Sequence, residues 1–522
     1  MGLLDIPVEI LDEILDLSLP LGIEGLALSC KAIYQRAAPQ IRQHNALRRT
    51  WRCTNNSRTR RTDDTLQILY DIFQEPLGAD YIEVLDLCDE RIPNDGHYLT
   101  DRQWGAVEEP QSRSIEPNSR SSINFREIPM AMGNLKTFIE KSFQATAKQV
   151  NMDDVWSDIM KTELHPDEDD YKESIWTVVS LLNMLPNITT LRLPSWWEGP
   201  QGAVGETLHS IAQAANITGG PPKSLSKLKT ILPFAEIGYE SKAALQSVYE
   251  CLTLGTMREL YLVSAVAVDD QYTGQPFKWI HPELTSSITR IEFAASCIDA
   301  DGLSQLVAHT PHLAIFKYSH QCKWHGCQYD WNAGTFVETL AHHCGNTIIE
   351  IALTLEGLHG HIINGTSSFR SFPKLEKLEV DIELFCGPPV ESGQRQGQDA
   401  YIPPGDNPWA KADIPCIGSM LPDNMREVQI NTDYETPDHD ALRALLKNLR
   451  EQRAERLHHL ERVIVREYNG KSVQDLVDQA GATLETLGAG SMGPYLKENV
   501  PEWRRKFNDR MVRMLQGNLS TD

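Results

Sequence analysis

One short apolar pattern recurs along most of the chain. An apolar residue is followed three positions later by a second apolar residue, and two positions after that by a third. Residues two apart share one face of a β-strand, so each copy predicts a short strand with a buried face. The copies are Ile188/Leu191/Leu193, Met257/Leu260/Leu262, Ile288/Ile291/Phe293, Leu313/Phe316/Tyr318, Ile348/Ile351/Leu353, Leu375/Leu378/Val380, Met425/Val428/Ile430 and Leu460/Val463/Val465, with a partial copy at Leu228/Ile231.

Helix-like segments follow several of these strands, at Gly302–His309, Thr335–His342 and Asp440–Arg450. One strand–helix unit cannot bury the inner face of its own strand, whereas stacked units complete one core and one parallel sheet. The pattern therefore favours an irregular α/β solenoid, and it resembles degenerate leucine-rich repeats. Such repeats imply a concave surface suited to protein recognition. The alternative is a globular α/β domain with several buried strands.

Composition restricts the class of protein. The 522 residues are 41% hydrophobic and 23% charged, as in ordinary globular proteins, and they suffice for several domains. A formal net charge of −23 argues against bulk nucleic-acid binding, which needs a basic face. The chain shows neither a signal peptide nor an apolar run of about 20 residues. We therefore expect no membrane association, a cytoplasmic or nuclear location, and mostly reduced cysteines.

The first 52 residues differ from the rest. Residues 1–26 hold six acidic and no basic residues, and residues 27–52 hold six basic and no acidic ones. Apolar residues recur with helical spacing before Pro20 and Gly22, which end a predicted first helix. A second helix is expected from about Ile23 and a third after an interruption near Pro39. Three short helices bury little core, so such a unit usually relies on a partner.

An Ile-Pro-x-Glu-Ile-Leu opening is followed by Ile-Leu and then by Leu-x-Leu-Ser-Cys-Lys-x-Ile-Tyr. This order resembles the F-box, especially its fungal form. The resemblance implies a three-helix module that binds a Skp1-like adaptor of a cullin-based (SCF-type) ubiquitin ligase. The segment at Leu19–Gly22 departs from the family pattern. An ordinary helical hairpin that caps a larger domain is the alternative. The positions that match the family motif are Leu4, Ile6, Pro7, Ile10, Leu11, Ile14, Leu28, Cys30 and Lys31.

The expected fold class is thus α/β, with an N-terminal three-helix F-box followed by an irregular leucine-rich-repeat-like α/β solenoid. A strand is also expected at Ile82–Leu87. The expected organisation is an F-box-like domain at 1–52, a connecting helix and first strand at 53–93, an exposed loop at 94–126, a repeat-like domain at 127–500 with an insertion at 386–415, and a C-terminal helix and tail at 501–522.

Two short motifs carry residue types used in catalysis or cofactor binding. His320, Cys322, His325 and Cys327 offer zinc-ligand chemistry, with His342, His343 and Cys344 nearby, but not in the order of a standard finger. Gly488, Gly490 and Gly493 fit a dinucleotide-binding spacing, yet Pro494 follows at once and no βαβ unit can follow. We interpret both motifs as loop residues, and we expect no catalytic residues, metal or cofactor.

Five tryptophans follow predicted strands, at Trp196, Trp197, Trp279, Trp324 and Trp331. They fit partner anchors and buried packing residues equally well. The stretch Trp503–Leu515 is expected to be an amphipathic helix that caps the last repeat.

These features lead to three hypotheses. The first is a substrate-recognition adaptor whose F-box binds Skp1 and whose repeats hold a protein substrate of unknown identity. The second is a repeat scaffold for protein–protein interaction without ligase association. The third is an enzyme that uses one of the two short motifs.

Overall fold

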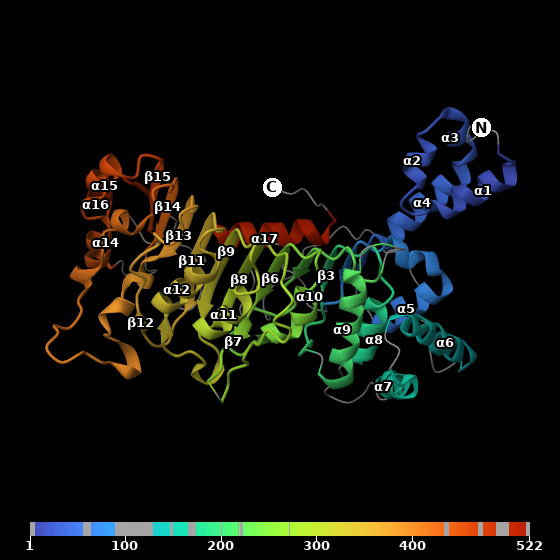
Figure 1. The fold of residues 1–522 in the computed structure, drawn as a ribbon, viewed down its shortest axis with the longest axis horizontal. Coiled ribbons are helices and arrows are strands. Elements are labelled where there is room, and N and C mark those ends of the chain that lie inside the picture. Colours follow the sequence, from blue (N-terminus) through green and yellow to red (C-terminus); the bar gives the residue numbers. More distant parts are fainter. Residues whose placement is uncertain are drawn as a thin grey trace, which may run out of the picture.

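The computed structural model describes residues 6–55, 64–88, 129–146, 150–164, 174–199, 201–217, 219, 223–270, 272–432, 438–467, 473–486 and 501–517. It is an elongated mixed α/β structure built around a large parallel sheet, with a small helical module at its N-terminal end (Figure 1). No helix in these ranges is both long and apolar enough to cross a membrane. The segment 94–126 and the glycines 488–493 lie outside the described residues.

The sheet follows the order of the sequence. Every pair of neighbouring strands on its main path is parallel. That path is β1 (Cys53–Asn55), β2 (Val84–Asp86), β3 (Thr190–Arg192), β4 (Thr230–Leu232), β6 (Glu259–Val263), β8 (Arg290–Ile298), β9 (Ile315–Gln321), β11 (Glu350–Gly357), β13 (Lys377–Asp381), β14 (Glu427–Asn431), β15 (Arg462–Glu467) and β16 (Thr483–Thr486).

Short strands lie beside this path. β5 (Ala243–Ala244) pairs with β7 (Ala265–Ala267), which also pairs with the second half of β8. β10 (Trp331–Asn332) and β12 (Ile362–Asn364) form a separate parallel pair. Ser264 and Ala295 have φ values of 53° and 47°, and they mark the points where the backbone bends between the two sets of strands.

The recurring apolar pattern predicted the strands correctly. The central residue of each of the nine copies lies on a strand of the main path, and the first residue comes two positions before that strand; the strand expected at Ile82–Leu87 is β2. The central residues of successive copies pair with each other, in the order Leu191, Ile231, Leu260, Ile291, Phe316, Ile351, Leu378, Val428 and Val463. They belong to one hydrophobic core that also contains the apolar sides of the helices between strands. Each strand thus buries one face by stacking on its neighbours and under a helix.

The helices that connect the strands pack on this core. The segments expected at Gly302–His309 and Thr335–His342 correspond to α11 and α12, whereas Asp440–Arg450 is divided because Asn448 has a left-handed φ of 56°. These helices are α5 (Asp64–Gln74), α6 (Pro129–Thr146), α7 (Met152–Leu164), α8 (Ile175–Leu182), α9 (Gly202–Asn216), α10 (Tyr249–Leu252), α11 (Ala300–Val307), α12 (Ala333–Cys344), α13 (Ile417–Met420), α14 (His439–Leu446), α15 (Leu449–Glu455) and α16 (Gln474–Ala480).

The N-terminal module contains four helices instead of the three expected. They are α1 (Val8–Leu17), α2 (Ile23–Ala27), α3 (Lys31–Arg36) and α4 (Ala38–Trp51). The interruption expected near Pro39 is present: α3 ends at Arg36, and Pro39 lies in the first turn of α4, where its missing N–H leaves no helical hydrogen bond unmade. The difference from expectation is a further break at residues 28–30, which divides the expected second helix into α2 and α3.

The segment 386–415 leaves the strand order intact, because β13 pairs directly with β14. It contains the 3₁₀ turns η7 (Val390–Ser392), η8 (Gly397–Asp399) and η9 (Lys411–Asp413). The backbone N–H of Gln398 donates to the carboxylate of Asp330 at 2.7 Å, which ties the segment to the loop before β10.

The C-terminal helix α17 (Glu502–Leu515) does not cap the last strand, contrary to expectation. It lies across the sheet face opposite the other helices (Figure 1). Its apolar side chains pack on the strand residues that alternate with those of the main core, namely Leu232, Tyr261, Val263, Ala294 and Ala352. The helix packs here because the middle strands present a hydrophobic stripe on that face. The last strand, β16, has polar residues instead, namely Thr483, Glu485 and Thr486.

Candidate protein-interaction surfaces

The N-terminal module has a hydrophobic core of its own, separate from that of the sheet. It consists of Leu11, Leu15, Ile23, Ala27, Ile33 and Ala37. Oppositely charged side chains pair across the module: Arg36 forms two hydrogen bonds with Asp12, at 2.7 and 2.6 Å, and Arg48 donates to Glu24 at 2.8 Å. The separation of acidic and basic residues in the sequence therefore corresponds to pairing between the first two helices and the last two.

The nine residues that match the family motif do not share one environment. Leu11 is buried in the core of the module, and Ile6 and Ile14 are half-buried. Leu4 lies outside the described residues. Exposed are Pro7, Ile10, Leu28, Cys30 and Lys31. The structure therefore separates one residue that holds the module together from five that are available to a partner.

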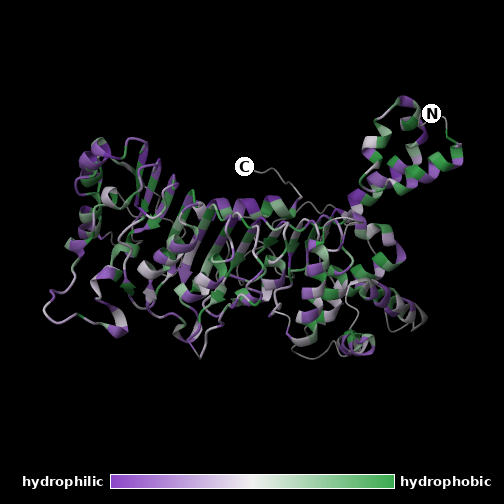
Figure 2. Cartoon of the chain, viewed as in Figure 1, coloured by the Kyte–Doolittle hydropathy of each residue, from purple (hydrophilic) through white to green (hydrophobic). Residues whose placement is uncertain are grey.

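Two of the exposed motif residues are apolar side chains with large exposed fractions, 79% for Leu28 and 47% for Ile10. Four further apolar side chains of the module are also exposed, and the motif does not include them: Val8, Leu17, Leu21 and Tyr34. The signal was present in α1, where six of ten residues are apolar although only Leu11 and Leu15 face the core. Hydrophobic residues run along this helix in Figure 2 as well. An apolar surface of this density on a small module is typical of a protein interface.

The end of α4 fixes the module to the start of the sheet. The ring of Trp51 packs directly on Gly78, so closely that a Cβ atom there would lie 2.6 Å from Cε2 of Trp51. Nδ1 of His44 lies 3.0 Å from the hydroxyl of Tyr81. The strand β1 follows α4 almost at once, so the module sits beside the first strand.

Charged contacts hold α17 on its face of the sheet. Nε of Arg504 donates to Glu356 at 2.6 Å, and Nη1 of Arg510 donates to Glu292 at 2.7 Å. Burial acts to raise the pKa of Glu356, but Arg504 and the hydroxyl of Ser319 outweigh it, so the pKa is lowered and the carboxylate stays charged. At the start of the helix, the carboxylate of Glu379 accepts the N–H groups of Glu502 and Trp503, at 2.9 and 3.1 Å.

The helix α17 therefore covers the middle strands on the sheet face opposite the connecting helices. Its first turn contacts β13 through Glu379, and Phe507 contacts Tyr261 of β6. At its far end, Nη2 of Arg52 donates to the carbonyl of Gly517 at 3.1 Å, next to β1. A partner of this protein would meet α17, or the loops at the sheet edges, before it met the middle strands.

The four residues with zinc-ligand chemistry point to different partners. His320 is buried and stacks on Trp331, with ring centroids 4.4 Å apart, and its Nδ1 lies 2.8 Å from the hydroxyl of Tyr318. Cys322 donates to the carbonyl of Gln328. The Sγ of Cys327 lies 3.7 Å from that of Cys297, and His325 is exposed. Within the described ranges, no group of three His, Cys, Asp or Glu residues is placed to hold a metal ion.

The five tryptophans divide into two kinds. Trp197, Trp279 and Trp331 are buried, and Trp196 is half-buried. These four pack between strands and helices. Trp324 is 49% exposed and is the member of the set that remains available to a partner.

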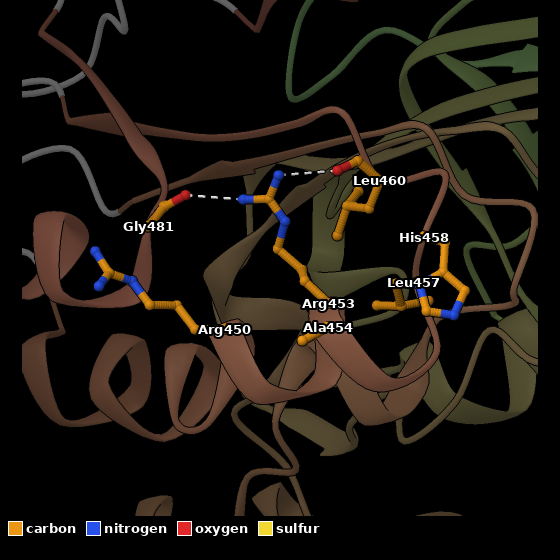
Figure 3. A pocket seen from close by; sticks show the side chains of 7 residues that line it. All are labelled: Arg450, Arg453, Ala454, Leu457, His458, Leu460 and Gly481. Carbon is orange, nitrogen blue, oxygen red and sulfur yellow. Dashed lines mark hydrogen bonds between the residues drawn. The ribbon is translucent and has the colours of Figure 1, made fainter.

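An open pocket beside α15 has a volume of about 470 Å³ (Figure 3). Its ionisable lining residues are Arg450, Arg453 and His458. The guanidinium of Arg453 already donates to the carbonyls of Gly481 and Leu460, each at 2.9 Å. The lining set has neither a carboxylate nor a nucleophile, so it offers no acid–base pair for catalysis.

The chain matches no protein-family model, and no curated protein sequence matches it.

Proposed function

We propose that this protein is a substrate-recognition adaptor of a cullin-based ubiquitin ligase. In this proposal the N-terminal module is an F-box that binds a Skp1-like adaptor, and the sheet region recognises a protein substrate. One observation carries the proposal: a module with a small core of its own presents a group of exposed apolar side chains, led by Ile10 and Leu28.

The positions of the exposed residues support this assignment. Five of the eight described residues that match the family motif are exposed. Leu28, which is 79% exposed, is one of six exposed apolar side chains on this small module, and it is their number that favours an interface. Exposed Lys31, next to exposed Cys30, adds a positive charge to the apolar area.

The sheet supports the second half of the proposal. Parallel strands in sequence order, joined by helices on one face and paired in register through one repeated apolar position, fit an irregular leucine-rich-repeat-like solenoid. Such an array offers a long surface made of loops from successive units, which suits recognition of another protein.

A specific observation favours a second candidate, a repeat scaffold without ligase association. Trp51 and His44 attach the helical module next to β1, the first strand of the sheet. Covering a sheet edge is in itself a sufficient structural reason for a helical cap. In that case the module protects the sheet and has no partner.

Binding to a purified Skp1-like adaptor separates the two candidates. Full-length protein carrying Leu28→Asp and Ile10→Asp should fold normally and lose the adaptor in a pull-down, because both side chains are exposed. Ile217→Asp is the matched control, since Ile217 is 67% exposed and lies after α9, outside the module. If the unmodified protein fails to capture the adaptor, the ligase proposal is wrong and the scaffold is favoured.

A further inference from the structure

Several exposed aromatic side chains gather at one edge of the sheet. Tyr239 follows β4, Tyr272 follows β7, Trp324 and His325 follow β9, and His359 follows β11. Because these strands are parallel, the loops after them emerge at the same edge. We call these five residues the aromatic loop surface.

Direct contacts join the five residues into one surface. The rings of Tyr239 and His359 lie 5.2 Å apart, and those of Tyr272 and His325 lie 5.9 Å apart. Trp324 and His325 are in contact, with ring centroids 3.9 Å apart. The backbone N–H of Trp324 donates to the carbonyl of Tyr239 at 2.9 Å, which links the two halves.

The surface rests on a rigid base. Lys323 is fully buried, and its Nζ donates to the carbonyl of Gly238, to Oγ of Ser264 and to Oε1 of Gln321, at 2.8, 3.0 and 2.8 Å. His325 has a left-handed φ of 60° that the surrounding contacts maintain. A surface held in place in this way loses little entropy when it binds a partner.

The aromatic side chains are open to solvent. Tyr272 is 82% exposed and Trp324 is 49% exposed. Among the residues that the structure describes, the exposed large aromatic side chains number six, and three of these belong to the aromatic loop surface. The others are Tyr34, Tyr329 and Tyr401. Tyr329 lies in the same loop as Trp324.

Exposed acidic groups accompany these rings. Glu240 follows Tyr239, and Asp269 and Asp270 come just before Tyr272; all three are exposed. Burial acts to raise the pKa of Asp270, but hydrogen bonds from Thr273 and from nearby backbone N–H groups outweigh it and lower the pKa to about 2. Two neighbouring lysines use their ammonium groups within the protein: Lys323 is buried beneath the surface, and half-buried Lys242 donates to the carbonyl of Thr273 at 2.6 Å.

Aromatic faces and carboxylates together favour one class of ligand. A cation above a Trp or Tyr ring is attracted by the ring, and Arg also stacks on it. The chain as a whole carries a net charge of −23, which attracts cationic partners at long range. We propose that the aromatic loop surface binds an arginine- or lysine-containing segment of a partner protein. If the ligase proposal holds, this segment belongs to the substrate. Binding of the segment does not itself depend on the proposed function.

The test selects peptides against the purified full-length protein. A phage library of random dodecapeptides is panned on it, and a fluorescein-labelled copy of an enriched peptide is titrated by anisotropy. Enriched sequences should contain Arg or Lys, and Tyr272→Ala with Trp324→Ala should weaken binding by roughly 5- to 30-fold. Tyr401→Ala is the matched control, because Tyr401 is 53% exposed and lies in the segment 386–415, outside the aromatic loop surface; binding should be unchanged.

Several results overturn the proposal. They are enrichment of sequences without basic residues, no enrichment at all, or equal binding by the double variant and the unmodified protein when both melt at the same temperature. A concentration-dependent dimer that Trp324→Ala abolishes would assign the surface to a second copy of the chain instead. No ligase component is present in the peptide-binding assay. A negative result there would not contradict the ligase proposal, and a negative Skp1 pull-down would not contradict peptide binding.

Discussion

Arg510 in α17 donates a hydrogen bond to Glu292 in the centre of the sheet, at 2.7 Å, across 218 residues of sequence. The Glu292 side chain is fully buried, and the other cations near it are Arg290 at 2.8 Å and Lys317 at 3.9 Å. The C-terminal helix is therefore bound to the sheet by charge as well as by apolar area. Because Arg290 still pairs with Glu292, Arg510→Ala should lower the free energy of unfolding by about 1–3 kcal/mol.

Arg504→Ala should cost more, about 3–5 kcal/mol, because the buried carboxylate of Glu356 then loses its guanidinium and keeps the hydrogen bond from the hydroxyl of Ser319, at 2.6 Å. Urea denaturation followed by circular dichroism measures both changes. Arg505→Ala is the control, since Arg505 is exposed on the same helix. Equal stability of all three variants would show that α17 is held by its apolar side chains alone.

Acid should destabilise the protein through His320. Burial lowers the pKa of this histidine from 6.5 to about 3. The neutral ring thus stabilises the fold fully above pH 6.5, and this contribution is lost as the pH falls from 6.5 towards 3. The loss reaches about 2 kcal/mol at pH 5, from 1.36 kcal/mol per pKa unit. Unfolding free energies at pH 7 and pH 5 should differ less in His320→Gln than in the unmodified protein, and His359→Gln, at an exposed histidine, should retain the full difference.

The attachment of the N-terminal module should depend on Gly78. A methyl group there would lie 2.6 Å from the Trp51 ring, so Gly78→Ala should destabilise the junction by about 1–3 kcal/mol. Gly133→Ala in α6 is the matched control, because nothing lies within 4 Å of its added methyl group, and it should be neutral or slightly stabilising. Thermal unfolding measures both variants, and a Gly78→Ala variant as stable as the unmodified protein would contradict this packing.

Leu11 and Leu28 should respond in opposite ways, although both match the family motif. Leu11 is buried, so Leu11→Ala should destabilise the module by about 2–5 kcal/mol. Leu28→Ala should change stability by less than about 0.5 kcal/mol. Limited proteolysis of the N-terminal 52 residues distinguishes the two variants. A Leu28→Ala variant cleaved as fast as Leu11→Ala would show that Leu28 is part of the fold.

The strands could be predicted from sequence because each repeats the same local pattern. Leu260, Ile291 and Phe316 each lie three residues after another apolar residue, and this spacing alone defines the buried face. The pairing of these residues in register follows once the strands are parallel and consecutive. The number of helices in the N-terminal module was less predictable, because residues 28–30, where α2 and α3 separate, contain neither proline nor glycine.

The position of α17 could not be predicted. Its apolar stripe and its helical period are visible in the sequence, but Trp503 and Phe507 carry no signal that selects β6 and β11 over β16. The aromatic loop surface could not be predicted either, because it also depends on contacts between distant parts of the sequence. Trp324 and Tyr272 are 52 positions apart in the sequence, and they come together only because parallel strands bring their loops to one edge.

The position of α17 also sets the order in which the protein can be completed during synthesis. The ribosome makes every strand that α17 covers before it makes α17, so Tyr261 and Val263 lack their apolar cover on the nascent chain. Arg510, which pairs with Glu292, is synthesised 218 residues after it. A product that terminates early would retain an uncovered apolar sheet face, on which Glu292 and Glu356 lack the guanidinium partners that α17 supplies. Chaperones and proteases that bind exposed apolar segments would then have a direct means of distinguishing truncated chains from finished ones.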